Sequence, residues 1–362
     1  MSTPPISPPE TLKCTVDTGF AEWLAASGGS LAISTYQAGR LFLVGWNGRQ
    51  VSFLPRAFDR PMGLDVSGSR MALATRNSLF LFANSAALAP GYLAPNRYDA
   101  LYLPHLEYHL PDLQIHDLAY ADNELWMVNT RLSCLCVPSA DATFEPRWRP
   151  RFIDDLAPED RCHLNGLAVR DARPAFVTAL GTTNTPQGWR EAKHKGGVVI
   201  DVDSQETVLA GLAMPHSPRW HDGALWLLNS GEGQLLRMSS DGRADVVCEL
   251  PAYLRGLSFV GGCALVGLCQ IRERKVFGGM PVADRHAELV CGVAVIDLAS
   301  GRQRGLMRFT EGCSEIYDLR FLPGMQRPNV LNTAKDDVKL AISAADCWYW
   351  LPKEELAAEQ PK

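Results

Sequence analysis

The sequence has no long hydrophobic run, few cysteines and almost no helical periodicity. No stretch of about 18 apolar residues occurs, so we expect no transmembrane helix. Ten cysteines among 362 residues are too few for a disulfide framework. The first nine residues are polar and rich in proline, and they lack the charged and apolar regions of a signal peptide. These absences predict a cytoplasmic protein that does not contact a membrane.

Long basic runs are also missing. The net charge is −5 and the pI is about 5.9, an acidic balance that argues against nucleic acid as the main partner. Hydrophobic residues make up 46% of the chain and charged residues 21%, which are ordinary values for a globular protein with a large core. The composition leaves the oligomeric state open.

One residue pattern recurs six times. Short apolar segments alternate with clusters of Gly, Asn, Asp and Pro, which is typical of many short antiparallel strands. Each copy has a turn, then a small or acidic residue, an apolar residue, a variable residue and a bulky one. The copies lie at residues 62–66, 116–120, 165–169, 216–220, 255–259 and 317–321, and Pro218 and Arg219 interrupt the fourth. Further strands follow most copies, so the repeat predicts the blades of a β-propeller.

The last copy of the repeat has too little chain after it for a whole blade. Residues 30–56, in contrast, look like three strands that lack a first strand. We therefore predict an all-β, six-bladed propeller in which the C-terminal strand near Tyr317 completes the N-terminal blade and closes the ring. The whole chain, 1–362, is expected to be one domain. Its blade strands span about 30–322, and residues 1–14 and 323–362 are peripheral.

The blade geometry predicts where polar side chains converge. The loop that enters the first strand of a blade and the loop that joins its second and third strands lie on the same face, because each hairpin reverses direction. Side chains on these loops should meet at one mouth of the channel, and ligand sites favour such concave mouths. The residues that we predict to bind a substrate there are Gln37, Asn129, Trp189, Asn229, Arg255 and Arg272.

Three of the eight histidines are expected at this mouth, namely His116, His163 and His216. Together with Glu315 they could hold Zn, Fe, Mn or Cu, because these metals accept mixed nitrogen and oxygen ligands. A second interpretation is a metal-free ligand or catalytic pocket. With or without a metal, the residues that we predict to be catalytic are His163, Glu315 and Tyr317. A third is a structural plug of polar side chains that bind only one another or water. The sequence leaves all three open.

Arg255 belongs to the same repeat position and is expected to face the channel. A lone arginine at a concave mouth commonly binds a carboxylate or phosphate through its planar fork. The alternative is an ion pair with Glu315 or Asp318 of the neighbouring blade.

Several segments resemble an uncharacterised bacterial family of conserved hypothetical six-bladed propeller-like proteins. They are the stretches STYQAGR at 34–40, SPRWH at 217–221, CQIRER at 269–274 with FGG at 277–279, and EIYD at 315–318. The resemblance runs from about residue 15 to about residue 335, and it implies the fold and marks the same face. More distantly, the strand pattern is similar to that of NHL-repeat and regucalcin/gluconolactonase-like propellers. Those groups bind a divalent ion through carboxylates and amides. In this sequence Asn165 and Glu315 are the amide and the carboxylate that would correspond to such ligands.

These observations favour an enzyme that acts on a small polar or anionic metabolite or peptide at the channel mouth, either with a bound metal or without one. The reaction type stays open. The alternative function is a non-catalytic scaffold that binds a protein or peptide partner on the same face. Buried histidines at a closed mouth would favour the enzyme, and a flat face with exposed aromatic side chains would favour the scaffold.

Overall fold

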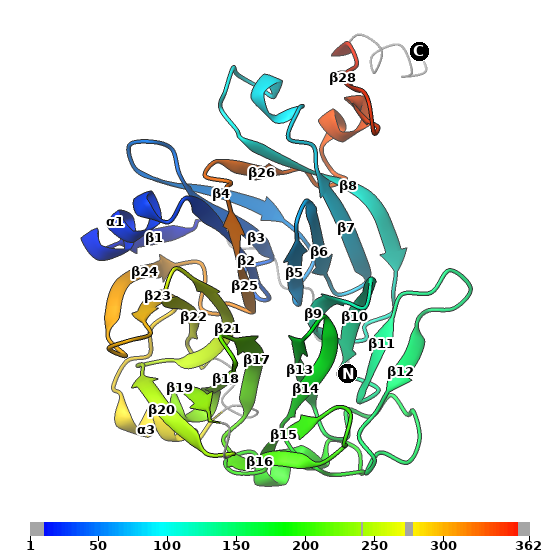
Figure 1. Cartoon of the computed structure of the whole chain (residues 1–362), viewed down its shortest axis with the longest axis vertical. Helices are drawn as coiled ribbons and strands as arrows, with labels where there is room; N and C mark the ends of the chain where they lie inside the picture. Colours follow the sequence, from blue (N-terminus) through cyan, green and yellow to red (C-terminus); the bar gives the residue numbers. More distant parts are fainter. Residues whose placement is uncertain (1–10, 240–241, 272–277, 354–362) are drawn as a thin grey trace.

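The computed structural model describes residues 11–239, 242–271 and 278–353. Six antiparallel sheets surround a central channel, as Figure 1 shows. The innermost strands of neighbouring sheets contact each other in the order β25, β5, β9, β13, β17, β21 and back to β25. The predicted six-bladed propeller is therefore confirmed.

We number the sheets as blades 1 to 6 along the chain and give the strands from the channel outward. Blade 1 contains β25 (Asp318–Pro323), β2 (Gly29–Thr35), β3 (Arg40–Trp46) and β4 (Val51–Ala57). Blade 2 contains β5 (Leu64–Ser67), β6 (Arg70–Ala74), β7 (Ser78–Asn84) and β8 (Ala100–His109), and blade 3 contains β9 (Ile115–Ala121), β10 (Glu124–Asn129), β11 (Cys134–Val137) and β12 (Glu145–Trp148). Blade 4 contains β13 (Leu164–Arg170), β14 (Arg173–Ala179), β15 (Gly197–Asp201) and β16 (Thr207–Leu212). Blade 5 contains β17 (Pro215–His221), β18 (Ala224–Asn229), β19 (Gln234–Met238) and β20 (Ala244–Glu249), and blade 6 contains β21 (Tyr253–Val260), β22 (Cys263–Cys269), β23 (Gly292–Asp297) and β24 (Gln303–Glu311).

The ring closes through β25, as the sequence predicts. This strand pairs with β2 without interruption from Gly29 opposite Pro323 to Ser34 opposite Asp318. Both ends of the chain also add strands outside the four-stranded blades. The strand β1 (Lys13–Val16) pairs with β24, and β26 (Pro328–Val330) pairs in parallel with β8. These additions cover backbone groups that an open edge would expose.

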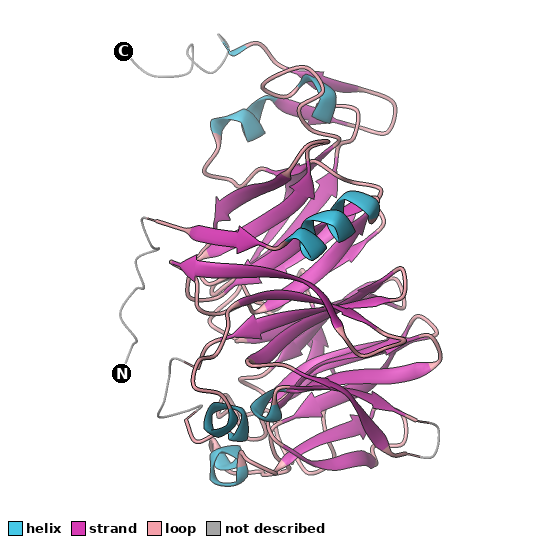
Figure 2. Ribbon diagram, turned by 90° about the vertical axis from the view of Figure 1, so that its left-hand side faces the viewer, coloured by secondary structure: helices cyan, strands magenta, loops and turns pink. Residues whose placement is uncertain are grey.

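Helices are few and lie on the periphery (Figure 2). The helix α1 (Thr18–Ala26) begins at Asp17, whose side chain accepts a hydrogen bond from the amide of Phe20 at 2.7 Å. Its buried residues Phe20, Trp23 and Leu24 pack against the core between blades 1 and 6. None of the helices in the described ranges is long and apolar enough to cross a membrane.

Other short elements lie at the ends of loops. They are η1 (Ala89–Gly91), η2 (Gly188–Ala192), η3 (Ser230–Glu232), α3 (Pro281–Arg285) and η4 (Asp336–Leu340). The C-terminal hairpin of β27 (Ala341–Ser343) and β28 (Trp348–Trp350) packs beside η1, where Trp350 stacks on Tyr92 with 5.2 Å between ring centres. All ten cysteines are free.

A network of buried charges fills the middle of the channel. Arg320 of β25 binds Asp318 at 2.6 Å, Asp65 of β5 at 2.9 Å and Asp117 of β9 at 3.2 Å. Arg219 of β17 binds Asp117 at 2.7 Å. We call these five side chains the charged plug. It links blades 1, 2, 3 and 5, and it separates the two mouths of the channel.

The interrupted fourth repeat supplies part of this plug. The register of β17 against β18 shifts between His216 and Arg219, and Ser217 in this bulge has a φ of +51°. The bulge re-aims the strand so that the Arg219 guanidinium reaches Asp117 across the channel. The break in the apolar pattern therefore corresponds to an ion pair that closes the channel.

Candidate functional site

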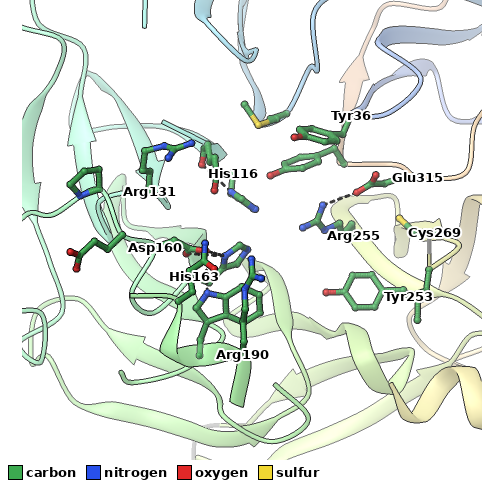
Figure 3. A pocket seen from close by; sticks show the side chains of 18 of the residues that line it. Tyr36, His116, Arg131, Asp160, His163, Arg190, Tyr253, Arg255, Cys269 and Glu315 are labelled. Carbon is green, nitrogen blue, oxygen red and sulfur yellow. Dashed lines mark hydrogen bonds and ion pairs between the residues drawn. The ribbon is translucent and has the colours of Figure 1, made fainter. Parts of the chain in front are cut away.

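Two rings of side chains stand above the charged plug at one mouth of the channel. The upper ring comes from a residue that begins each innermost strand or lies up to four positions before it, and the lower ring comes two residues later. The upper ring contains Arg60, Gln114, His163, Met214, Tyr253 and Glu315, and the lower ring contains Met62, His116, Asn165, His216, Arg255 and Tyr317. Eight of these twelve residues line a cavity of about 490 Å³, which Figure 3 shows. The exceptions are Arg60, Met214, Asn165 and His216.

His163 is held by a buried carboxylate. Its Nδ1 atom lies 2.9 Å and 3.0 Å from the two carboxylate oxygens of Asp160. The Trp189 indole donates to Asp160 Oδ2 at 3.1 Å and packs against the imidazole with 4.5 Å between ring centres. The Nε2 atom of His163 is buried and has no hydrogen-bond partner among the described residues. The arrangement is a carboxylate–imidazole pair in which the second ring nitrogen, Nε2, has no hydrogen bond to the described residues.

The backbone at this pair is in an unusual conformation. Asp160 has a φ of +51° and His163 a φ of +52°, in the left-handed region that residues other than glycine rarely adopt. Each such residue costs about 1–3 kcal/mol, and such residues cluster at functional sites. Here two of them lie within four positions, at the two residues whose side chains form the pair.

His116 and His216 share one local geometry. The Nδ1 atom of His116 lies 2.9 Å from the carbonyl of Gln114, and that of His216 lies 2.9 Å from the carbonyl of Met214. In both cases the carbonyl belongs to a residue two positions earlier with a positive φ, +55° at Gln114 and +52° at Met214. A carbonyl only accepts hydrogen bonds, so Nδ1 carries the proton and Nε2 is the acceptor in the neutral ring.

The environment keeps both imidazoles neutral. Burial lowers the pKa of His116 well below its usual value, and the neighbouring His163 and Arg255 lower it further. Burial and then Arg255 lower the pKa of His216 in the same way. His116 is half-buried and lines the cavity, so it presents a bare Nε2 acceptor there.

Arg255 connects the two sides of the site. Its Nη1 atom donates to Glu315 at 3.0 Å, and its Nη2 atom donates to His216 Nε2 at 3.2 Å. The guanidinium lies over the ring of Tyr317, 4.5 Å from its centre. The expected ion pair with Glu315 is present, while the Nε atom of Arg255 is buried without a partner in the described part of the chain.

Tyr317 stacks on Tyr36 with 5.7 Å between ring centres and lies 5.3 Å from His116. Its hydroxyl is buried and unpartnered within the described ranges. Burial raises the pKa of Tyr317 well above its usual value, even though Arg255 acts in the opposite direction. The phenol therefore stays protonated at neutral pH and can donate a hydrogen bond.

The four predicted metal ligands do not fit a common metal ion. His216 and Glu315 both bind the guanidinium of Arg255, so a cation already occupies the space between them. Arg255 stays charged because Tyr317 and Glu315 raise its pKa against the effect of burial. Over residues 11–239, 242–271 and 278–353, no group of three His, Cys, Asp or Glu side chains is arranged to hold a metal.

The other predicted residues lie at different depths. Trp189 lines the cavity although it is almost fully buried. Gln37 is not among the residues that line the cavity, and its side-chain oxygen accepts a hydrogen bond from Ser314 at 3.3 Å. Asn129 and Asn229 are buried behind the mouth, where they accept from the amides of Leu132 and Ala213 and so order their loops. Arg272 lies outside the described residues.

Sequence reasoning missed several residues that line the cavity. They are Arg131, Asp160, Arg190 and Tyr253. Tyr253 occupies the same repeat position as His163, so aligning the repeats two residues earlier would have found it. Asp160 lies on an irregular loop and Arg190 on the short helix η2, where no strand periodicity applies.

Comparisons with known proteins agree with this fold. The model of a domain of unknown function, DUF4915, matches residues 18–331. A search of the curated proteins found no match. The chain is similar to a chain of the nidogen/laminin complex, with 10% identity over 82% of this chain and 98% of that one and a TM-score of 0.50.

Two further solved structures are similar to the chain at lower scores. An inactive virginiamycin B lyase from Staphylococcus aureus has 9% identity over 83% of this chain and 100% of its own, with a TM-score of 0.42. The calcium-binding protein regucalcin from Agrobacterium tumefaciens has 12% identity over 82% of this chain and 85% of its own, with a TM-score of 0.41. Identities this low show the fold alone.

Proposed function

The chain belongs to DUF4915, a family of unknown function, and we propose that its cavity is the active site of an enzyme that transfers protons on a small polar or anionic molecule. The observation that supports this most strongly is the buried Asp160–His163 pair, whose Nε2 atom has no partner among the described residues. Such a pair is the usual arrangement of a general base, because the carboxylate fixes the tautomer and stabilises the imidazolium that forms.

In this proposal His163 removes the proton. Asp160 accepts from Nδ1, and Trp189 holds the carboxylate through its indole N–H, so the imidazole cannot rotate without breaking its hydrogen bond to Asp160. When Nε2 takes a proton, the positive charge forms beside the Asp160 carboxylate. Asp160 and Trp189 act as positioning residues, and His163 is the catalytic residue.

Tyr317 and Arg255 supply the hydrogen-bond donor and the positive charge that complement the base His163. The neutral Tyr317 phenol can donate a proton or a hydrogen bond to an oxygen that becomes negative during the reaction. The guanidinium 4.5 Å from the ring centre would stabilise such negative charge. Glu315 orients Arg255 through their 3.0 Å contact, which gives this predicted residue an indirect role.

The shape of the mouth favours a small molecule over a protein partner. His163 and Arg255 are each less than 8% exposed, and the polar groups face a cavity. The large apolar side chains that are exposed on the described residues lie elsewhere. They are Leu93, Leu106, Val246, Ile342, Trp348 and Tyr349.

We expect His163→Gln to reduce turnover by about a hundredfold, the lower end of what a general base contributes. The measurement is incubation of the protein in D₂O with a defined panel of small hydroxy acids, keto acids and sugar acids, followed by mass spectrometry for deuterium uptake or conversion. The matched control is His105→Gln, since His105 is exposed on β8. Turnover that survives His163→Gln within a few-fold would contradict the proposal, as would a panel that the wild-type protein neither binds nor converts.

A further inference from the structure

We infer that the cavity binds a small hydroxy carboxylate, whose hydroxyl donates to His116 or His163 and whose carboxylate accepts from Tyr317 and Arg255. The inference rests on the proposed function in that it names the substrate class for the same site. It depends on which polar atoms of the cavity donate and which accept.

One side of the cavity offers acceptors. The Nδ1 atoms of His116 and His163 are committed to the Gln114 carbonyl and the Asp160 carboxylate. Thr130 accepts from the same His116 nitrogen at 2.7 Å and donates its own proton to the Leu164 carbonyl at 2.5 Å. Both rings therefore keep Nε2 as their acceptor, and the ring centres are 4.8 Å apart. A ligand satisfies these atoms only by donating a hydrogen bond.

The adjacent side offers donors. The Tyr317 hydroxyl and Arg255 Nε are both buried and have no partner in the part of the chain that the structure describes. Two donors on neighbouring side chains suit the two oxygens of one carboxylate. The ring centres of His116 and Tyr317 are 5.3 Å apart, so donor and acceptor groups must lie close together on the ligand. A hydroxyl next to a carboxylate meets this requirement.

The charges of the site decide between related ligands. The burial and the nearby Arg255 charge that keep the pKa of His116 low would equally disfavour a ligand ammonium at that place. A neutral hydroxyl is therefore the better donor. Glu315 already neutralises part of the Arg255 charge, so a monoanionic carboxylate fits better than a dianionic phosphate.

The walls of the cavity indicate the rest of the ligand. Tyr36, Trp189 and Tyr253 line it, and about 490 Å³ exceeds what a three-carbon acid fills. An aromatic or other flat apolar group attached to the hydroxy acid would contact these rings. Phenyllactate is therefore a suitable probe.

The experiment is calorimetric titration with four matched compounds, each tested also as its three-carbon analogue. They are phenyllactate, 3-phenylpropionate without the hydroxyl, phenylalanine with an ammonium in its place, and 3-phenylpropane-1,2-diol without the carboxylate. We expect a hydroxy acid to bind about tenfold more tightly than each of its three counterparts, because each counterpart loses or impairs one polar contact.

Two variants test the assigned contacts. The double variant His116→Leu/His163→Leu should bring the affinity ratio of hydroxy acid to deoxy acid close to one, and Tyr317→Phe should lower the ratio of hydroxy acid to diol, because Arg255 is then the one remaining proposed donor to the carboxylate. A general loss of folding would lower all affinities and leave these ratios unchanged. The controls are His105→Leu and Tyr349→Phe, which alter exposed residues of the same types.

The inference is overturned if the deoxy acid or the amino acid binds as tightly as the hydroxy acid in both series, or if no hydroxy acid binds at up to about 10 mM, a range that detects millimolar ligands. Selective binding of a hydroxy acid that the protein never converts would support this inference and contradict the proposed enzyme. Conversion of a compound that lacks a hydroxy carboxylate would support the enzyme and overturn this inference.

Discussion

A chain that ends at residue 314 is expected to lose cooperative unfolding altogether. The deletion removes β25, which pairs with β2 over six consecutive residue pairs and forms the innermost strand of blade 1. It also removes Arg320 and Asp318 from the charged plug, which leaves Asp65, Asp117 and Arg219 of three other blades incompletely paired. Unpaired strand edges and an open ring favour aggregation.

The matched control is a chain that ends at residue 334. It keeps β25 and β26 and loses the hairpin of β27 and β28, so we expect it to unfold cooperatively near the temperature of the full chain. Thermal unfolding followed by circular dichroism and by calorimetry compares the two. Cooperative unfolding of the 314-residue chain at the normal temperature would contradict the ring closure.

Arg320→Met is expected to destabilise the protein by about 3–5 kcal/mol, the range found when one partner of a buried ion pair is removed. The substitution leaves Asp65, Asp117 and Asp318 with Arg219 as their one remaining plug arginine. Asp117 and Asp318 are almost fully buried, so water cannot replace the lost hydrogen bonds. Urea unfolding of the variant against the wild type measures the difference.

The pH dependence of this loss identifies its cause. Burial raises the pKa of Asp318 to about 6 although Arg320 lowers it, so the variant should raise that pKa further. A carboxyl with a raised pKa in the folded state favours folding when protonated, and this contribution is lost as pH rises through the folded pKa. The deficit of Arg320→Met should therefore be smaller at about pH 5 than at pH 7.5. A deficit below 1 kcal/mol, or no larger than that of the exposed control Arg302→Met, would contradict the plug as a stabilising element.

The fold could be predicted from the sequence because strand repeats are local. The positions of β9, β13 and β25 agree with the repeat to within a few residues, and the missing first strand of blade 1 reveals the closure. The added strands β1 and β26 could not be predicted in this way. Each is four residues or fewer and pairs with a distant segment, so its own sequence carries little signal.

The sequence predicted the face of the propeller on which the candidate site lies better than it predicted the chemistry of the site. The repeat brought His116, His163, Arg255, Glu315 and Tyr317 to one mouth, and the structure places all five around the cavity. It could not show that the Arg255 guanidinium stands between His216 and Glu315, because a side-chain direction between blades depends on packing. For the same reason the sequence could not distinguish a metal site that includes His216 and Glu315 from an ion pair between Arg255 and Glu315.

The partner of His163 was the most important omission. Asp160 lies three residues before it on a loop, and both residues have positive φ angles. Such angles are uncommon outside glycine, and although aspartate and histidine adopt them more often than most residues, the sequence alone does not show where they occur. The pair becomes visible only when the loop geometry is known.

The most direct test of the central claim is nitrogen NMR of the histidine side chains in labelled protein without ligand. The account predicts that His116, His163 and His216 each carry a proton on Nδ1 and leave Nε2 as the acceptor, because their Nδ1 atoms face Gln114, Asp160 and Met214. It also predicts that His116 and His216 stay neutral at about pH 5.5, where an exposed histidine is mostly charged. Assignment by His→Gln variants identifies each signal. A proton on Nε2 of neutral His163, or a charged His116 at that pH, would contradict an active site built on imidazole acceptors.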